Sequence, residues 1–71
     1  MVDDRIKVQM LKGRLAQWEQ GFYGGQVDVA VAQACGDERM ENAAKEQMRR
    51  AQRAMDKLNE MLAELEAPPD E

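Results

Sequence analysis

The stretch Ala34-Cys35-Gly36-Asp37-Glu38, at the midpoint of the 71-residue chain, decides the fold. Glycine is the preferred residue just past a helix C-terminus because, lacking a Cβ, it enters the left-handed region freely. Aspartate is a preferred N-cap because its carboxylate accepts the free backbone N–H groups of the next helix. We therefore predict that one helix ends at Cys35 and another begins at Glu38, with Gly36 and Asp37 as turn and caps.

The segment before this turn predicts a long helix over about residues 3–35. Asp3 or Asp4 can cap its start and complement its dipole. Apolar residues then recur three and four positions apart, which places them in one narrow stripe of a helix. These residues are Val8, Leu11, Leu15, Trp18 and Phe22.

Glycines interrupt this first helix at Gly21 and at Gly24-Gly25. Each glycine costs about 1 kcal/mol in a helix relative to alanine. Beyond them the apolar residues shift to a different side of the helix, where they form a second stripe. We therefore expect the helix either to continue with a kink near Gly24-Gly25 or to break there. The second stripe comprises Val27, Ala30, Val31 and Ala34.

The segment after the turn predicts a second helix over about residues 38–66. Its apolar stripe has a regular four-three spacing, and three further apolar residues widen one flank. Pro68-Pro69 ends the helix, so residues 67–71 are expected to be a frayed acidic tail. The stripe comprises Met40, Ala44, Gln47, Ala51, Ala54, Leu58, Met61 and Leu65, and the flank comprises Met48, Met55 and Leu62.

Two matched helices joined by a short turn predict an all-α, antiparallel αα-hairpin forming a single domain over residues 1–71. The large side chains at Trp18 and Phe22 are expected opposite the small Ala51 and Ala54. A chain of this size buries only about 60% of its unfolded surface and is marginally stable alone. The wide flank of the second helix and the second stripe of the first remain uncovered. We therefore expect a homodimer that completes a four-helix bundle.

The composition argues against an enzyme. The chain contains no histidine, serine or threonine, which removes the usual nucleophiles, the commonest general base and histidine metal ligands. Cys35 is expected at a helix C-terminus, where the dipole disfavours a thiolate, and we interpret it as structural. We predict no catalytic residue, no metal and no cofactor.

The sequence also bears on location. A single cysteine excludes an internal disulfide framework and fits a reducing compartment. The acidic start Met1-Val2-Asp3-Asp4 is not followed by the apolar segment of a signal peptide. No apolar run approaches the roughly 20 residues that span a bilayer. We expect a cytoplasmic protein without a membrane anchor.

Two groups of residues are candidate binding sites. The first is a partner interface, because aromatic side chains dominate interface hot spots and methionines adapt to partners. The second is a cationic strip that can contact phosphates. The net charge of −4 and the acidic residues that follow the strip favour a salt-bridged surface, so nucleic acid is not the expected partner. The interface residues are Trp18, Phe22, Tyr23, Met48, Met55 and Leu62, and the strip residues are Arg49, Arg50, Arg53 and Lys57.

These features together predict a non-enzymatic helical module for protein–protein interaction or assembly. Its partners are a second copy of itself and an unidentified protein. The alternative is a small regulator of the phage or plasmid type, which either binds nucleic acid through the cationic strip or inhibits a host enzyme.

Overall fold

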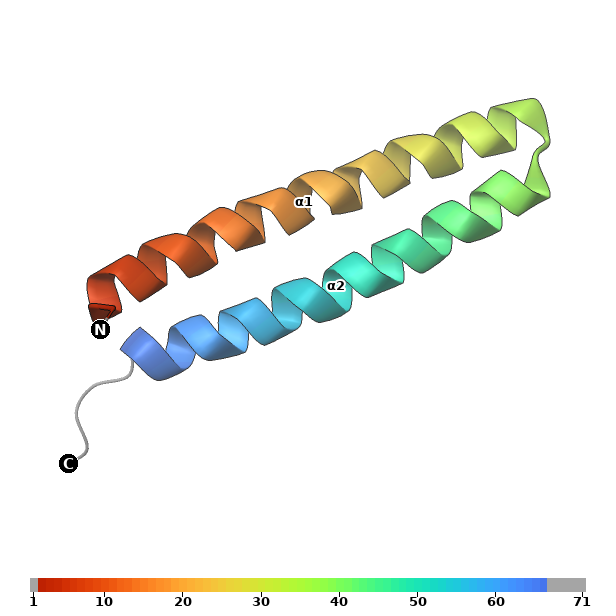
Figure 1. Cartoon of the computed structure of the whole chain (residues 1–71). Helices are drawn as coiled ribbons and strands as arrows, with labels where there is room; N and C mark the ends of the chain where they lie inside the picture. The colour runs from red at the N-terminus through yellow and green to blue at the C-terminus, as the bar shows by residue number, and fades with distance from the viewer. Residues whose placement is uncertain (1, 67–71) are drawn as a thin grey trace.

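The structure, a computed structural model, describes residues 2–66. Helix α1 spans Asp4–Cys35, helix α2 spans Glu38–Glu66, and the two pack side by side in opposite directions (Figure 1). Together they form a rod with principal dimensions of 55 × 21 × 15 Å. The predicted all-α antiparallel hairpin is thereby confirmed. The expected acidic tail, 67–71, lies outside the described residues.

The turn is built as the sequence predicts. Gly36 adopts φ 67° and ψ 31°, the left-handed conformation that glycine enters without a Cβ clash. Its N–H donates to the Gln33 carbonyl at 3.3 Å, and the Asp37 N–H donates to the Ala32 carbonyl at 2.8 Å. These two bonds form a Schellman motif. The Asp37 carboxylate then accepts the Met40 N–H at 3.0 Å, so this residue closes one helix and caps the next.

Helix α1 begins at an aspartate cap and passes through its glycines without a break. The Arg5 N–H donates to the Asp3 carboxylate at 3.1 Å, which identifies Asp3 as the N-cap. Residues 4–35 are α-helical throughout, including Gly24-Gly25, and no sharp bend is visible there (Figure 1). The predicted kink or break is therefore wrong. Packing against α2 along the whole length outweighs the low helix propensity of the glycines.

The residues of α1 that are covered by α2 continue at one heptad spacing from end to end. We call this set the inner seam of α1. The inner seam does not change sides at the glycines, although the apolar stripe was predicted to shift there. It continues to the turn through Gly25, Val29 and Ala32. Gly25 and Ala32 are buried, most of the others are half-buried, and Trp18 is the least covered at 37% exposed. The inner seam of α1 comprises Val8, Leu11, Leu15, Trp18, Phe22, Gly25, Val29 and Ala32.

The buried stripe of α2 is rotated from the predicted one. Six of the eight expected residues are buried or half-buried, namely Met40, Ala44, Ala51, Ala54, Leu58 and Leu65. Gln47 is exposed and Met61 is 38% exposed, whereas the residues expected on the flank are half-buried or, for Leu62, buried. The inner seam of α2 comprises Glu41, Ala44, Met48, Ala51, Met55, Leu58, Leu62 and Leu65.

Two contacts with α1 explain this rotation. A Cβ added at Gly25 would lie 2.5 Å from Met48 Cγ and 3.4 Å from the Ala44 carbonyl oxygen, so the glycine provides the space that Met48 occupies. Nearer the turn, the Gln33 amide donates to the Glu41 carboxylate at 3.1 Å and ties the helices together. Both contacts select the side of α2 that carries Glu41 and Met48.

The interior between the helices is thin. Among residues 2–66, the buried hydrophobic side chains are Ala32, Ala44, Ala51 and Leu62, and no large side chain is fully buried. Three of these four are alanines, which contribute little apolar area each. The hairpin by itself therefore has a small hydrophobic core.

Candidate interaction surface

Helix α1 carries a second row of uncharged residues on the side away from α2, apolar at its two ends and made of glycine and glutamine in its middle. Each member lies two positions before or after a residue of the inner seam, as Ile6 precedes Val8 and Met10 follows it. Two residues correspond to about 200° around an α-helix, so the second row faces almost directly away from the first. We call it the outer seam: Ile6, Met10, Gly13, Gln17, Gln20, Gly24, Val27, Val31 and Ala34.

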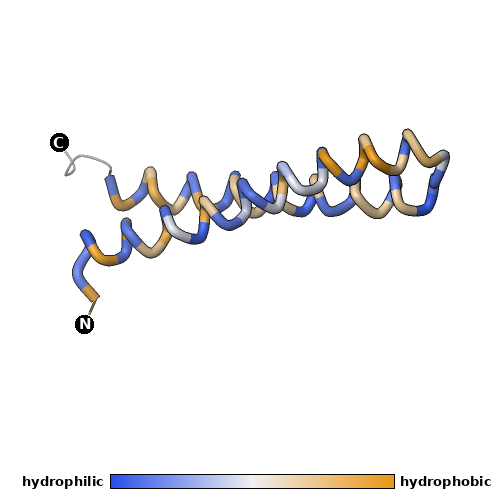
Figure 2. Tube along the Cα trace, turned by 90° about the horizontal axis from the view of Figure 1, so that it is seen from above, coloured by the Kyte–Doolittle hydropathy of each residue, from blue (hydrophilic) through white to orange (hydrophobic). Residues whose placement is uncertain are grey.

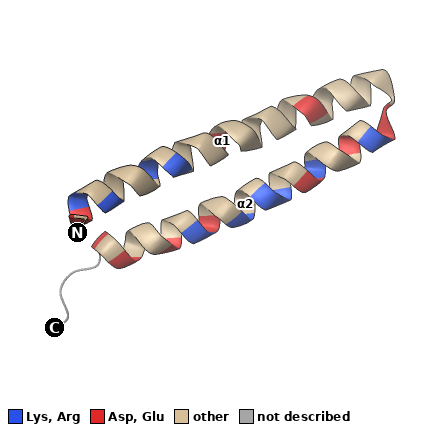
Figure 3. Cartoon of the chain, in the orientation of Figure 1, with Lys and Arg blue, Asp and Glu red and all other residues tan. Residues whose placement is uncertain are grey.

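The outer seam is exposed and uncharged. All its members are exposed except Gly24, which is half-buried. The largest apolar side chains are open to solvent: Met10 is 57% exposed, Ile6 49%, Val31 44% and Val27 42%. Figure 2 shows the resulting hydrophobic segment of α1 near the turn, and Figure 3 shows how few charges α1 carries there. This exposure makes the outer seam the candidate interaction surface of the described chain.

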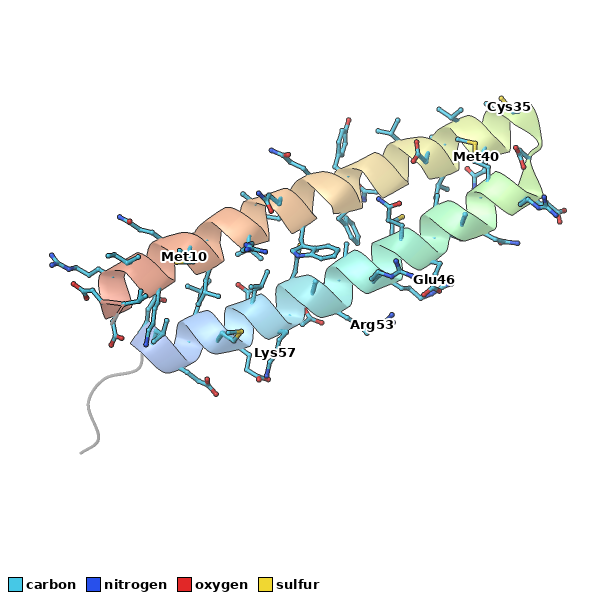
Figure 4. All side chains as sticks on the ribbon, viewed as in Figure 1. Met10, Cys35, Met40, Glu46, Arg53 and Lys57 are labelled. Atoms are coloured by element: carbon cyan, nitrogen blue, oxygen red, sulfur yellow. The ribbon has the colours of Figure 1, made fainter. Side chains whose placement is uncertain are left out.

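The corresponding face of α2 is charged, and its charges pair with one another. Arg49 and Arg53 both contact the Glu46 carboxylate, at 3.0 and 3.8 Å, and Lys57 contacts Glu60 at 2.8 Å. Figure 4 shows Glu46, Arg53 and Lys57 on the side of α2 away from α1. The Glu60 carboxylate beside Lys57 raises the pKa of that ammonium group. This face is suited to water.

The predicted cationic strip lies on this outer face of α2. Its four residues, Arg49, Arg50, Arg53 and Lys57, are exposed, and three of them are within ion-pair distance of a glutamate. Exposed pairs of this kind are weak, but they lower the positive charge offered to a phosphate. The arrangement is that of a salt-bridged surface, and phosphate contact by these residues stays a prediction.

The six residues of the predicted partner interface do not form one surface in the structure. Trp18 and Phe22 lie on the inner seam of α1, whereas Tyr23 is 67% exposed, so the three aromatic residues do not share one face. Met48, Met55 and Leu62 lie on the inner seam of α2 and are partly or fully covered within the chain. That these six residues meet another protein stays a prediction.

The predicted second stripe of α1 is found on the surface. Val27, Ala30, Val31 and Ala34 are all exposed, on a different side from Phe22. Sequence reasoning missed that this surface extends to the other end of α1 through Ile6 and Met10. The signal was present, because these residues continue the same heptad spacing backwards across Gly24, Gln20, Gln17 and Gly13.

The polar contacts near the turn are structural in character. Glu41 accepts from both Lys45 and Gln33, and these hydrogen bonds hold the pKa of its carboxyl below its usual value. Cys35 is exposed and has no disulfide partner, and Figure 4 shows it on the outside of the turn end. In residues 2–66, no group of three or more cysteine or carboxylate side chains is placed to hold a metal ion.

No described helix combines the length and apolar character required to cross a bilayer. Comparisons with family models, curated proteins and solved structures found no match to the chain.

Proposed function

We propose that the protein is a non-enzymatic helical module for protein interaction or assembly, and that it acts as a homodimer of four helices. The observation that carries this proposal is the outer seam of α1, which is long, exposed and uncharged. A helix that is apolar on opposite sides is typical of one buried within a larger assembly. A second copy covers this seam and places the α1 helices at the centre of the assembly.

The thin core of the hairpin supports self-association. A two-helix chain with a largely alanine interior has little buried area to offset the entropy of folding. Covering the outer seam adds apolar burial from residues such as Ile6, Met10 and Val31. Folding and dimerisation are then linked, so the stability of the hairpin depends on protein concentration.

The residue inventory supports a non-enzymatic role. Histidine, serine and threonine are missing from the whole sequence, and Cys35 lies at the C-terminal end of α1, where the helix dipole opposes a thiolate. In the proposed dimer, the charged faces of α2 point outward and are the surfaces available to a different protein.

The test is the mass in solution, measured by light scattering after size exclusion under reducing conditions. We expect a dimer for the wild type and a monomer for Val31→Glu, because the substitution buries a charge in the dimer interface. Ala43→Glu is the matched control, since Ala43 is exposed on α2 and lies outside the outer seam of α1. A monomeric wild type, or equal effects of the two substitutions, would contradict the proposal.

A further inference from the structure

We propose that the second copy packs its outer seam on that of the first with the two α1 helices antiparallel and centred near Gln20. This inference rests on the proposed self-association and specifies its partner surface and orientation. Each residue of one α1 then lies within about two positions of the level of the residue equally far from Gln20 on the partner. The size of the side chains, the charges and the shape of the open end of the hairpin all favour this orientation.

Coverage and packing favour this orientation. The outer seam runs from Ile6 to Ala34, about four heptads, with its large apolar side chains at the two ends and glycine and glutamine between them. Gln20 is its midpoint, so an antiparallel pair centred there covers the seam completely. Ile6 then faces Ala34, and Gly13 faces Val27, which sets a large residue against a small one. A parallel pair would set Gly13 against Gly13 and leave a void.

The amide at the centre fits the same geometry. Gln20 lies on the two-fold axis of the antiparallel pair and meets its own copy. A glutamine side chain carries both a donor group and an acceptor, so two of them can bond to each other across the axis. Each amide thereby keeps a partner when the interface removes it from water.

The charges beside the outer seam also favour the antiparallel orientation. Arg14 directly follows Gly13, and Asp28 directly follows Val27, so both flank the outer seam on the same side. Neither makes an ion pair with another residue in the described part of the chain, unlike most cations of α2. Arg14 lies six residues before Gln20 and Asp28 eight residues after it, so the antiparallel pair places Arg14 of one copy and Asp28 of the other on the same side of the interface, about 3 Å apart along the helix axis, twice per dimer. A parallel pair would place Arg14 and Asp28 on opposite sides of the interface and give neither this partner.

A groove at the open end of the hairpin is covered in the antiparallel orientation. This groove has a volume of about 330 Å³ and lies between the start of α1 and the end of α2. Met10 belongs to both the groove and the outer seam. In the antiparallel pair, the turn end of the second α1, including Val31, lies beside Met10 and covers the groove with apolar side chains. The groove is lined by Lys7, Met10, Leu11, Met61, Glu64 and Leu65.

The test uses the single native cysteine as a reporter. Lys7 lies 13 residues before Gln20 and Cys35 lies 15 after it, both on the same flank of the outer seam, so the antiparallel pair brings these positions near each other between chains, about 3 Å apart along the helix axis. Within one chain they are 28 helical residues apart, about 42 Å, far beyond the roughly 7 Å that a disulfide spans between Cα atoms. We expect the Lys7→Cys variant, mildly oxidised, to form an interchain disulfide on a non-reducing gel.

The controls separate this inference from the proposed function. The wild type has a cysteine only at position 35, and Lys7→Cys/Cys35→Ala has one only at position 7. Neither should form a disulfide-linked dimer, because the same position in the two copies lies at opposite ends of the antiparallel pair. A rapid Cys35–Cys35 disulfide in the wild type would overturn the antiparallel orientation. If the protein is dimeric by light scattering but Lys7→Cys forms no interchain disulfide, the antiparallel orientation is overturned and the proposed self-association is retained. A monomer would overturn both.

A charge exchange provides a second, non-covalent measurement. Arg14→Asp and Asp28→Arg should each raise the dimer dissociation constant, by roughly three- to tenfold for two exposed pairs. The double variant should restore the wild-type value, because it re-forms both pairs with reversed charges. Purely additive effects in the double variant would overturn the proposed register.

Discussion

The outer faces of the two helices differ although the helices share one hairpin and are nearly equal in length. The outer face of α2 carries arginines, lysines and glutamates that pair with each other, as at Glu46 and Lys57. The outer seam of α1 carries no charge and exposes Ile6, Met10, Val27 and Val31. The outer face of α2 is thus suited to water, whereas α1 presents apolar residues on two opposite sides, of which the hairpin covers one.

The largest effect is expected from overfilling the inner seam of α2. Ala51 is completely buried, so Ala51→Trp inserts a large side chain where the helices meet. We expect a loss of about 3 kcal/mol or more, seen as a collapse of helical circular dichroism or a sharply lower melting temperature. Ala43→Trp, on the exposed side of α2, should change stability by less than about 0.5 kcal/mol. Equal effects would refute the assignment of inner and outer faces.

The two neighbouring glycines of α1 should respond with opposite signs. A Cβ at Gly25 meets Met48, and overpacking of this kind costs about 1 to 3 kcal/mol, more than the gain in helix propensity. A Cβ at Gly24 meets nothing within 4 Å, so Gly24→Ala should stabilise α1 by up to about 1 kcal/mol. Melting temperatures of both variants at one protein concentration test this. A stabilising Gly25→Ala would contradict the close contact with Met48.

The junction between the helices should show a moderate effect. Asp37→Ala removes the carboxylate that accepts the Met40 N–H, and loss of an N-cap typically costs about 1 kcal/mol. Chemical denaturation measures the change. Asp37→Asn keeps an acceptor at the same position and should retain most of the stability. If alanine and asparagine behave alike, the cap contributes less than the geometry implies.

The smallest effect concerns pH. The folded state lowers the pKa of Glu41 below its ordinary value of 4.5, through Lys45 first and Gln33 second. Its stabilising contribution is therefore complete above about pH 4.5 and is lost as the pH falls through the lower, folded-state pKa. Denaturation midpoints measured between pH 6 and pH 3 should fall less in Glu41→Gln than in the wild type. Identical pH dependence in the two proteins would show that ionised Glu41 does not contribute to the stability of the hairpin.

The sequence predicted the helix limits well because their causes are local. Gly36 and Asp37 act within one turn of the backbone, and the structure places the helix ends within a residue of those predicted. Reasoning from the same local preferences went wrong at Gly24-Gly25, where helix propensity suggested a kink or break. The inner seam passes through Gly25 because α2 approaches closely there, and that approach is a property of the pair of helices.

The choice of buried face on α2 also depended on the partner helix. Ala44, Ala51, Leu58 and Leu65 recur every seven residues and are shared by two alternative stripes, one through Gln47 and Met61 and one through Met48 and Leu62. Apolar residues are present in both, so periodicity alone does not separate them. The space at Gly25 and the hydrogen bond from Gln33 to Glu41 select the stripe through Met48 and Leu62, because both contacts join α1 to that side of α2.

The sequence by itself therefore determined the two helices, their junction and the presence of apolar surface in excess of what one hairpin covers. These features follow from backbone preferences and composition, which act within a few residues. Only the tertiary structure decided which apolar residues are buried between α1 and α2 and which stay exposed. That assignment depends on how two helical surfaces fit each other, since a helix with apolar residues on opposite sides has no preferred face until a neighbour occupies one.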